Sequence, residues 1–168
     1  LDAITINFPT PQPKAKYAKK RLVHVDHLML YRPLFSAGAT VTLRTDSKPL
    51  RDYALGQFAA AGYDTLWVSD DVRRDHPEHP ETEYECRTRE MGAAVYGICA
   101  TPGEKPTEEQ LAAGREQEQS LACYLPDNLD ELTYVPLGME EAVENFRNRA
   151  RKGKKRLLFV RQFFVYDH

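Results

Sequence analysis

Hydrophobic positions along the first part of the chain alternate with polar ones in some segments and recur every three or four residues in others. Alternation is typical of strands that bury one face, and the wider spacing is typical of helices that bury one side. The elements that this pattern predicts are strand 3–8, helix 25–35, strand 39–45, helix 48–61 and strand 64–69. Strands and helices in this order predict an α/β fold whose parallel sheet is joined by crossover helices.

The sequence beyond residue 69 is more mixed. Residues 70–81 are charged and contain Pro77 and Pro80, which predicts a loop. Thr82 lies three residues before Glu85, the spacing of a capping box, so a short helix begins there. The further predicted elements are strand 93–100, linker 101–106, helix 107–122, strand 131–136, helix 139–152 and strand 156–166.

Composition and charge are ordinary for a globular chain of 168 residues, with 42% hydrophobic residues and a net charge of −2. That balance excludes a general polyanion binder, so any contact with nucleic acid has to come from a local patch. The three cysteines form no C-x-x-C pair and predict reduced thiols in the cytoplasm. We expect no membrane association, because no apolar run approaches the roughly 18 residues of a membrane span. The chain begins at Leu1, almost inside a strand, which suggests part of a longer polypeptide.

A stiff, cationic loop follows the first predicted strand. Three prolines (Pro9, Pro11 and Pro13) restrict its backbone, and five cations follow within eight residues: Lys14, Lys16, Lys19, Lys20 and Arg21. Ligands of open α/β sheets bind at loops that leave the carboxyl ends of strands. The loop therefore predicts an anionic partner, nucleic acid first, although a solvated basic loop is the simpler alternative.

Four motifs succeed one another along the first half of the chain. They are residues 7–14 (NFPTPQPK) with 19–22 (KKRL), residues 45–46 (TD) at a strand end, residues 61–63 (AGY) after a helix, and residues 82–85 (TEYE). In this order and spacing they resemble the bacterial tRNA (guanine-N7)-methyltransferases, which methylate a variable-loop guanine. The resemblance covers roughly residues 1–100, and the order of the motifs makes it specific.

This resemblance implies the later half of a class I, Rossmann-like methyltransferase fold in residues 1–100. The sequence beyond it predicts the linker 101–106 and a small α+β extension at 107–168. S-adenosylmethionine would then be bound mainly by residues upstream of this chain, which has no G-x-G-x-x-G. The isolated chain is accordingly expected to be inactive. tRNA is the expected partner, and the cytoplasm is the expected location.

The resemblance also implies which residues carry the function. Those on the substrate side are Lys14, Asp46, Thr82, Tyr84 and Glu85, and those that contact RNA are Lys16, Lys19, Lys20 and Arg21. Guanine N7 carries no proton, so methylation needs alignment and stabilisation of positive charge rather than a general base. Simpler structural alternatives are a helix N-cap for Asp46 or Ser47 and a plain capping box for residues 82–85.

Thr10 departs from the family pattern, which has an acidic, catalytic residue at this position. Two interpretations follow: a divergent active enzyme, or a non-catalytic RNA-binding relative that has lost the acid. A methyltransferase for a different substrate is a third and weaker alternative. A metal site is not predicted, because His76, His79 and Cys86 fit no compact zinc pattern.

Overall fold

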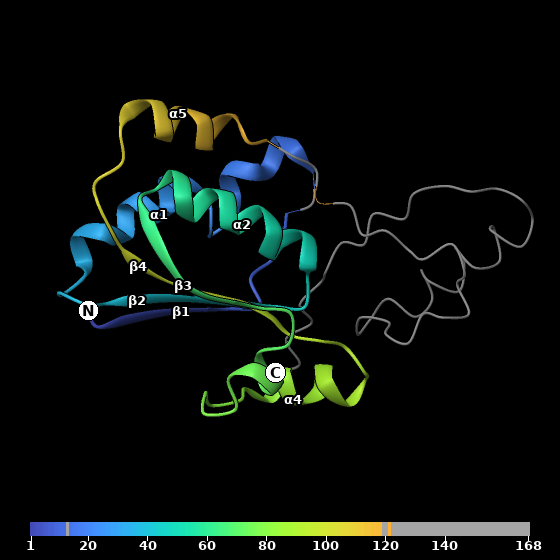
Figure 1. Ribbon diagram of the computed structural model, residues 1–168. Helices are drawn as coiled ribbons and strands as arrows, with labels where there is room; N and C mark the ends of the chain where they lie inside the picture. The colour runs from blue at the N-terminus through green and yellow to red at the C-terminus, as the bar shows by residue number, and fades with distance from the viewer. Residues whose placement is uncertain (13, 119–120, 122–168) are drawn as a thin grey trace, which may run out of the picture.

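The computed structural model describes residues 1–12, 14–118 and 121. Its sheet contains the strands β1 (Ala3–Asn7), β2 (Thr40–Thr45), β3 (Tyr63–Ser69) and β4 (Tyr96–Pro102), in the spatial order β1-β2-β4-β3 (Figure 1). These strands agree with the sequence prediction to within a few residues. The elements predicted at 131–136, 139–152 and 156–166 lie outside the described residues.

The first three strands are parallel to one another, as predicted, and the fourth is antiparallel, which was not predicted. β1 pairs with β2 in parallel, whereas β4 runs antiparallel to both β2 and β3. β1, β2 and β3 therefore share one direction, as the crossover argument requires. The connection from β3 to β4 begins and ends at the same end of the sheet, since Ser69 pairs with Gly97, and this makes β4 antiparallel.

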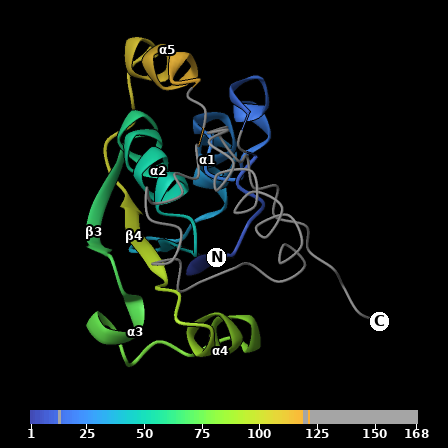
Figure 2. The ribbon, with the colours of Figure 1, turned by 90° about the vertical axis from the view of Figure 1, so that its right-hand side faces the viewer.

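Helices cover both faces of the sheet (Figures 1 and 2). On one face lie α1 (Val25–Tyr31), α2 (Lys48–Ala60) and α5 (Glu108–Glu116), with the 3-10 turns η1 (Ala15–Lys20) and η2 (Arg32–Leu34). On the other face lie α3 (Val72–Asp75) and α4 (Glu83–Glu90). The arrangement is the mixed α/β fold expected for a Rossmann-like methyltransferase. Within the part of the chain that the structure describes, we find no helix that could span a membrane.

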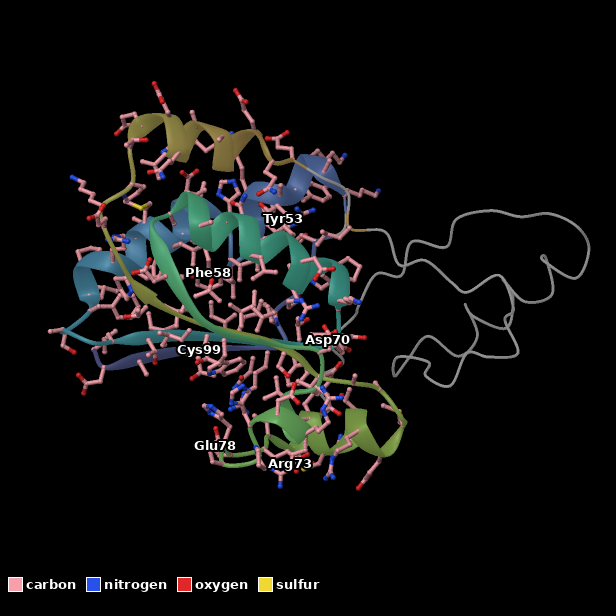
Figure 3. All side chains as sticks on the ribbon, in the orientation of Figure 1. Tyr53, Phe58, Asp70, Arg73, Glu78 and Cys99 are labelled. Atoms are coloured by element: carbon pink, nitrogen blue, oxygen red, sulfur yellow. The ribbon has the colours of Figure 1, made fainter. Side chains whose placement is uncertain are left out.

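The main core lies between the sheet and the α1–α2 layer. Leu28, Leu43, Tyr53, Phe58 and Ile98 are fully buried there and come from α1, α2, β2 and β4 (Figure 3 labels Tyr53 and Phe58). Burying a side chain of this size contributes about 1.5–3 kcal/mol. The core thus fixes the sheet, whose strand ends carry the residues of interest.

Local signals explain most helix boundaries. Ser47 caps α2 by accepting a hydrogen bond from the Leu50 N–H at 3.3 Å, and Gly62 ends it with φ +71°. The predicted loop 70–81 contains the short helix α3, which was missed because its four residues are too few to show a period. The helix predicted at 107–122 ends earlier, at Glu116.

α5 belongs to the same layer as α1 and α2. The Gln57 side chain donates to the Gly114 carbonyl at 2.8 Å, and Arg115 pairs with Asp26 at 2.8 Å. β4 extends to Pro102, so the first residues of the predicted linker are strand. The division into an α/β unit and a C-terminal extension beyond residue 106 stays a prediction.

Candidate substrate site

Three of the four motifs meet at one end of the sheet. Asn7 lies opposite Arg44 in the last parallel pair of β1 and β2, and the Phe8 N–H donates to the Arg44 carbonyl at 2.8 Å. The Phe8 ring packs on Tyr84 of α4 with their centroids 4.6 Å apart. The carboxyl ends of β1 and β2 and the start of α4 therefore form one locus, where open α/β sheets bind ligands.

Asp46 is positioned by α4 rather than by the helix that follows it. Its Oδ2 accepts a hydrogen bond from the Tyr84 hydroxyl at 3.3 Å, and the residue is partly exposed. Ser47 caps α2, so capping does not account for Asp46. A partly exposed carboxylate is left at a strand end, held by a tyrosine from across the site.

The loop after β1 has an unusual backbone. Phe8 and Gln12 have φ of +46° and +48°, a region that side chains disfavour. Such conformations cost about 1–3 kcal/mol each and persist only where surrounding contacts impose them. Thr10 lies between these two residues and is partly exposed. The loop therefore holds Thr10 in a defined place near the end of β1.

Arg21 supplies contacts that hold this loop. Its Nε donates to the Pro11 and Gln12 carbonyls at 3.2 Å, its Nη2 donates to Gln12 at 3.0 Å, and its guanidinium lies 4.4 Å from the centre of the Tyr53 ring. The side chain is fully buried, and desolvation by burial lowers its pKa. Burial does not fit the predicted phosphate contact, and we assign Arg21 a structural role.

Replacing Arg21 by lysine is expected to destabilise the protein by about 2–3 kcal/mol, because an ammonium cannot reproduce the fork to two carbonyls. Urea denaturation of the two proteins measures this. Lys20→Met, at an exposed position, serves as the control and should change stability by less than about 0.5 kcal/mol. Equal stability of Arg21→Lys and the parent protein would contradict the structural role.

The other predicted cations are on the surface. Lys14, Lys16, Lys19 and Lys20 are exposed, and all but Lys14 lie in η1. The ammonium groups of Lys16 and Lys20 lie 5.0 and 4.9 Å from the centre of the Tyr17 ring. An aromatic ring flanked by two exposed ammonium groups is a surface suited to a polyanion with bases that stack.

The TEYE motif divides into three roles. Thr82 caps α4 by accepting from the Glu85 N–H at 3.2 Å, as the simpler alternative holds. Tyr84 faces Asp46 and Phe8. Glu85 is only 2% exposed and pairs with Arg44, whose Nη1 lies 3.2 Å from Oε2. In this structure Glu85 thus ties α4 to β2, which differs from the predicted direct contact with substrate.

Arg44 is a residue that the sequence did not single out. It is 3% exposed and also donates to the Pro80 carbonyl at 2.6 Å. A charged residue inside an alternating strand is the signal that could have found it, since buried charges are paired. Phe8 belongs to the first motif, and its role became visible only in the structure, where its ring packs against that of Tyr84.

The chain is similar in sequence to known methyltransferases. A family model described as "Putative methyltransferase" matches residues 1–98. The curated tRNA (guanine-N(7)-)-methyltransferase of Streptococcus equi subsp. zooepidemicus is 30% identical over 102 residues, which are 60% of this chain and 48% of that protein. The enzymes of the same name from Alkaliphilus metalliredigens and Alkaliphilus oremlandii are 31% and 33% identical over 102 and 101 residues, again 60% of this chain and 48% of each. The chain spans about half the length of these curated relatives.

Proposed function

Since the chain belongs to the methyltransferase family whose model matches residues 1–98, we propose that it forms the substrate side of a tRNA (guanine-N7)-methyltransferase. The reaction would transfer a methyl group from S-adenosylmethionine to N7 of a variable-loop guanine. One observation carries this proposal: the Asp46 carboxylate, Tyr84 and the loop that holds Thr10 meet at the carboxyl ends of β1 and β2.

The proposed reaction requires the protein to align the two reactants and to stabilise the positive charge that forms on the guanine. N7 attacks the methyl carbon with its lone pair as the carbon–sulfur bond breaks, and the guanine becomes cationic. Asp46 would accept hydrogen bonds from the guanine N1–H and exocyclic amine and stabilise this positive charge. The Tyr84 hydroxyl holds the carboxylate in place. Alignment of the reactants supplies the rest of the rate enhancement.

S-adenosylmethionine, when bound, supplies the electrophilic methyl group. The described residues contain no glycine-rich turn between a strand and a helix that would cradle it. We therefore propose that sequence outside this chain provides most of the cofactor site, and that this chain by itself transfers no methyl group. The free thiols of Cys86 and Cys99 are consistent with a cytoplasmic location.

The exposed lysines Lys16, Lys19 and Lys20 would contact tRNA phosphates. Replacing Lys16, Lys19 or Lys20 by glutamine is expected to make the slope of log affinity against log salt less negative by about 0.7–0.9 for each lysine. Filter binding to one unmodified tRNA over a salt series measures the slope. Lys105→Gln is the matched control, because Lys105 is exposed beyond the opposite end of β4. An unchanged slope in all three variants would indicate a solvated basic loop instead.

Thr10 decides between the enzyme and a non-catalytic RNA-binding relative. We expect the full-length protein, meaning this chain together with the sequence that binds the cofactor, to transfer labelled methyl groups to unmodified tRNA. We expect Thr10→Asp to raise kcat, because it restores a charge-stabilising carboxylate. Nucleoside analysis of the product identifies the methylated base. If neither protein transfers methyl groups while both bind tRNA and S-adenosylmethionine, the non-catalytic alternative holds.

A further inference from the structure

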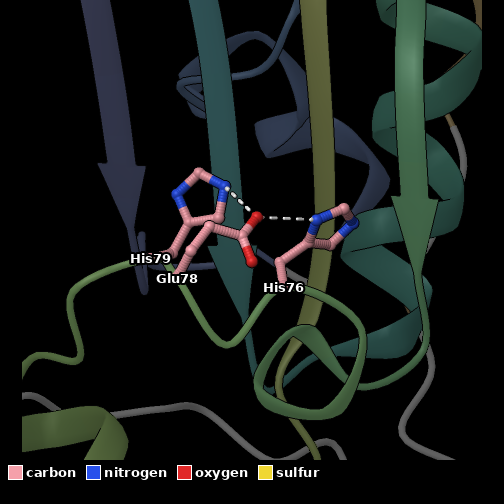
Figure 4. Close-up of side chains that lie close together, drawn as sticks. All are labelled: His76, Glu78 and His79. Atoms are coloured by element: carbon pink, nitrogen blue, oxygen red, sulfur yellow. Dashed lines mark hydrogen bonds and ion pairs between the residues drawn. The ribbon is translucent and has the colours of Figure 1, made fainter.

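Three potential metal ligands lie together on the face of the sheet that carries α3 and α4. The Glu78 Oε1 is 3.3 Å from His76 Nδ1 and 3.7 Å from His79 Nε2. All three ligand atoms lie within 4.8 Å of one another. Figure 4 shows both imidazoles turned toward the carboxylate. Cys86 does not belong to this group, whereas Glu78 does.

The two imidazoles are held by their surroundings. Trp67 stacks on His76 with ring centroids 4.0 Å apart and an interplanar angle of 26°, and its centroid is 5.7 Å from that of His79. A backbone turn, in which the His79 N–H donates to the His76 carbonyl at 3.1 Å, fixes their separation. The side chains of His76 and His79 are 21% and 32% exposed, while that of Glu78 is 66% exposed. The group is thus ordered on one side and open to solvent on the other.

We propose that His76, Glu78 and His79 bind one Zn²⁺ ion, with water completing a tetrahedral site. Two imidazoles and a carboxylate suit zinc among the abundant divalent ions. With zinc–ligand bonds of about 2.0–2.2 Å, tetrahedral ligands are about 3.3–3.5 Å apart, close to the separations from Glu78.

The ion would brace the loop that supports the substrate site. Pro80 directly follows His79, and its carbonyl accepts from Arg44, the partner of Glu85. Zinc at residues 76–79 would therefore fix the segment that leads into α4. It would thereby help to keep α4, and Tyr84 on it, packed against the sheet. The zinc ion would lie outside the substrate site, and the zinc proposal does not rest on the proposed function.

Calorimetric titration of ZnCl₂ into the tag-free full-length protein tests the site. We expect one ion per chain with a Kd of about 1 μM or below. Glu78→Gln and the double variant His76→Ala with His79→Ala should each weaken binding by at least about 100-fold, more than the 10–100-fold cost of losing an outer partner. Trp67→Leu should weaken it by about 10-fold. Glu90→Gln removes the same charge from an exposed position on α4 and should bind as the parent protein does.

Thermal unfolding with and without zinc gives a second readout. The parent protein and Glu90→Gln should gain stability with zinc concentration, and the double variant should not. A Kd above about 100 μM for the parent protein, or unchanged affinity in the double variant, would overturn the proposal. In either case the three side chains would form only a hydrogen-bonded cluster.

Discussion

Replacing Arg44 by methionine is expected to lower the free energy of unfolding by about 3–5 kcal/mol. The change leaves the Glu85 carboxylate buried at 2% exposure without its partner, and it removes the donor to the Pro80 carbonyl. An uncompensated buried charge is costly because it has lost its hydration without gaining a counter-charge. The pair therefore determines whether α4 stays on β2.

Denaturant titrations of three variants separate this effect from simple loss of charge. Arg44→Met combined with Glu85→Leu should recover most of the loss, since apolar pairs often replace buried ion pairs at little cost. Arg87→Met breaks the exposed pair with Glu83 on the same helix and should cost less than about 0.5 kcal/mol. If Arg44→Met and Arg87→Met were equally stable, the buried pair would have no such role.

Asp46→Asn is expected to reduce kcat/KM for tRNA methylation by about 10²–10³, the usual effect of losing one group that stabilises transition-state charge. Stability should change by less than about 1 kcal/mol, because Asp46 is partly exposed and Ser47 provides the helix cap. Tyr84→Phe keeps the ring on Phe8 but removes the hydrogen bond to Asp46, so we expect a smaller loss of about 10-fold.

Steady-state assays of the full-length variants measure these values. Asp64→Asn is the matched control, because Asp64 is an exposed aspartate at the opposite end of β3. It should leave kcat/KM unchanged. A parent-like rate for Asp46→Asn would show that another group stabilises the cationic base.

Local sequence signals predicted most helices and strands well, because the interactions that form and end these elements act between residues close together in the sequence. The alternation in β2 and the cap at Ser47 act within a few residues, and so does Gly62 at the end of α2. The direction of β4 depends instead on the path of the segment that follows Ser69. No local sequence pattern predicts that path, so the antiparallel pairing of β4 was not predicted.

The site was predictable as a set of motifs but not as a set of roles. Arg21 and Lys20 are adjacent cations in the sequence, yet one is buried under the loop and the other is exposed. Glu85 and Asp46 both carry carboxylates, and only tertiary contacts decide that the first pairs with Arg44 while the second accepts from the Tyr84 hydroxyl. Glu78 joins the two histidines for the same reason, through the fold of a short loop.

The most direct test of the proposed function compares two tRNA transcripts. One contains guanine, and the other contains 7-deazaguanine, in which a C–H group stands in place of N7. The full-length protein should transfer labelled methyl groups from S-adenosylmethionine to the first transcript and none to the second, while binding both with similar affinity. Equal transfer to both transcripts would contradict methylation at N7. No transfer to the guanine transcript, by protein that binds tRNA and S-adenosylmethionine, would contradict the enzyme itself.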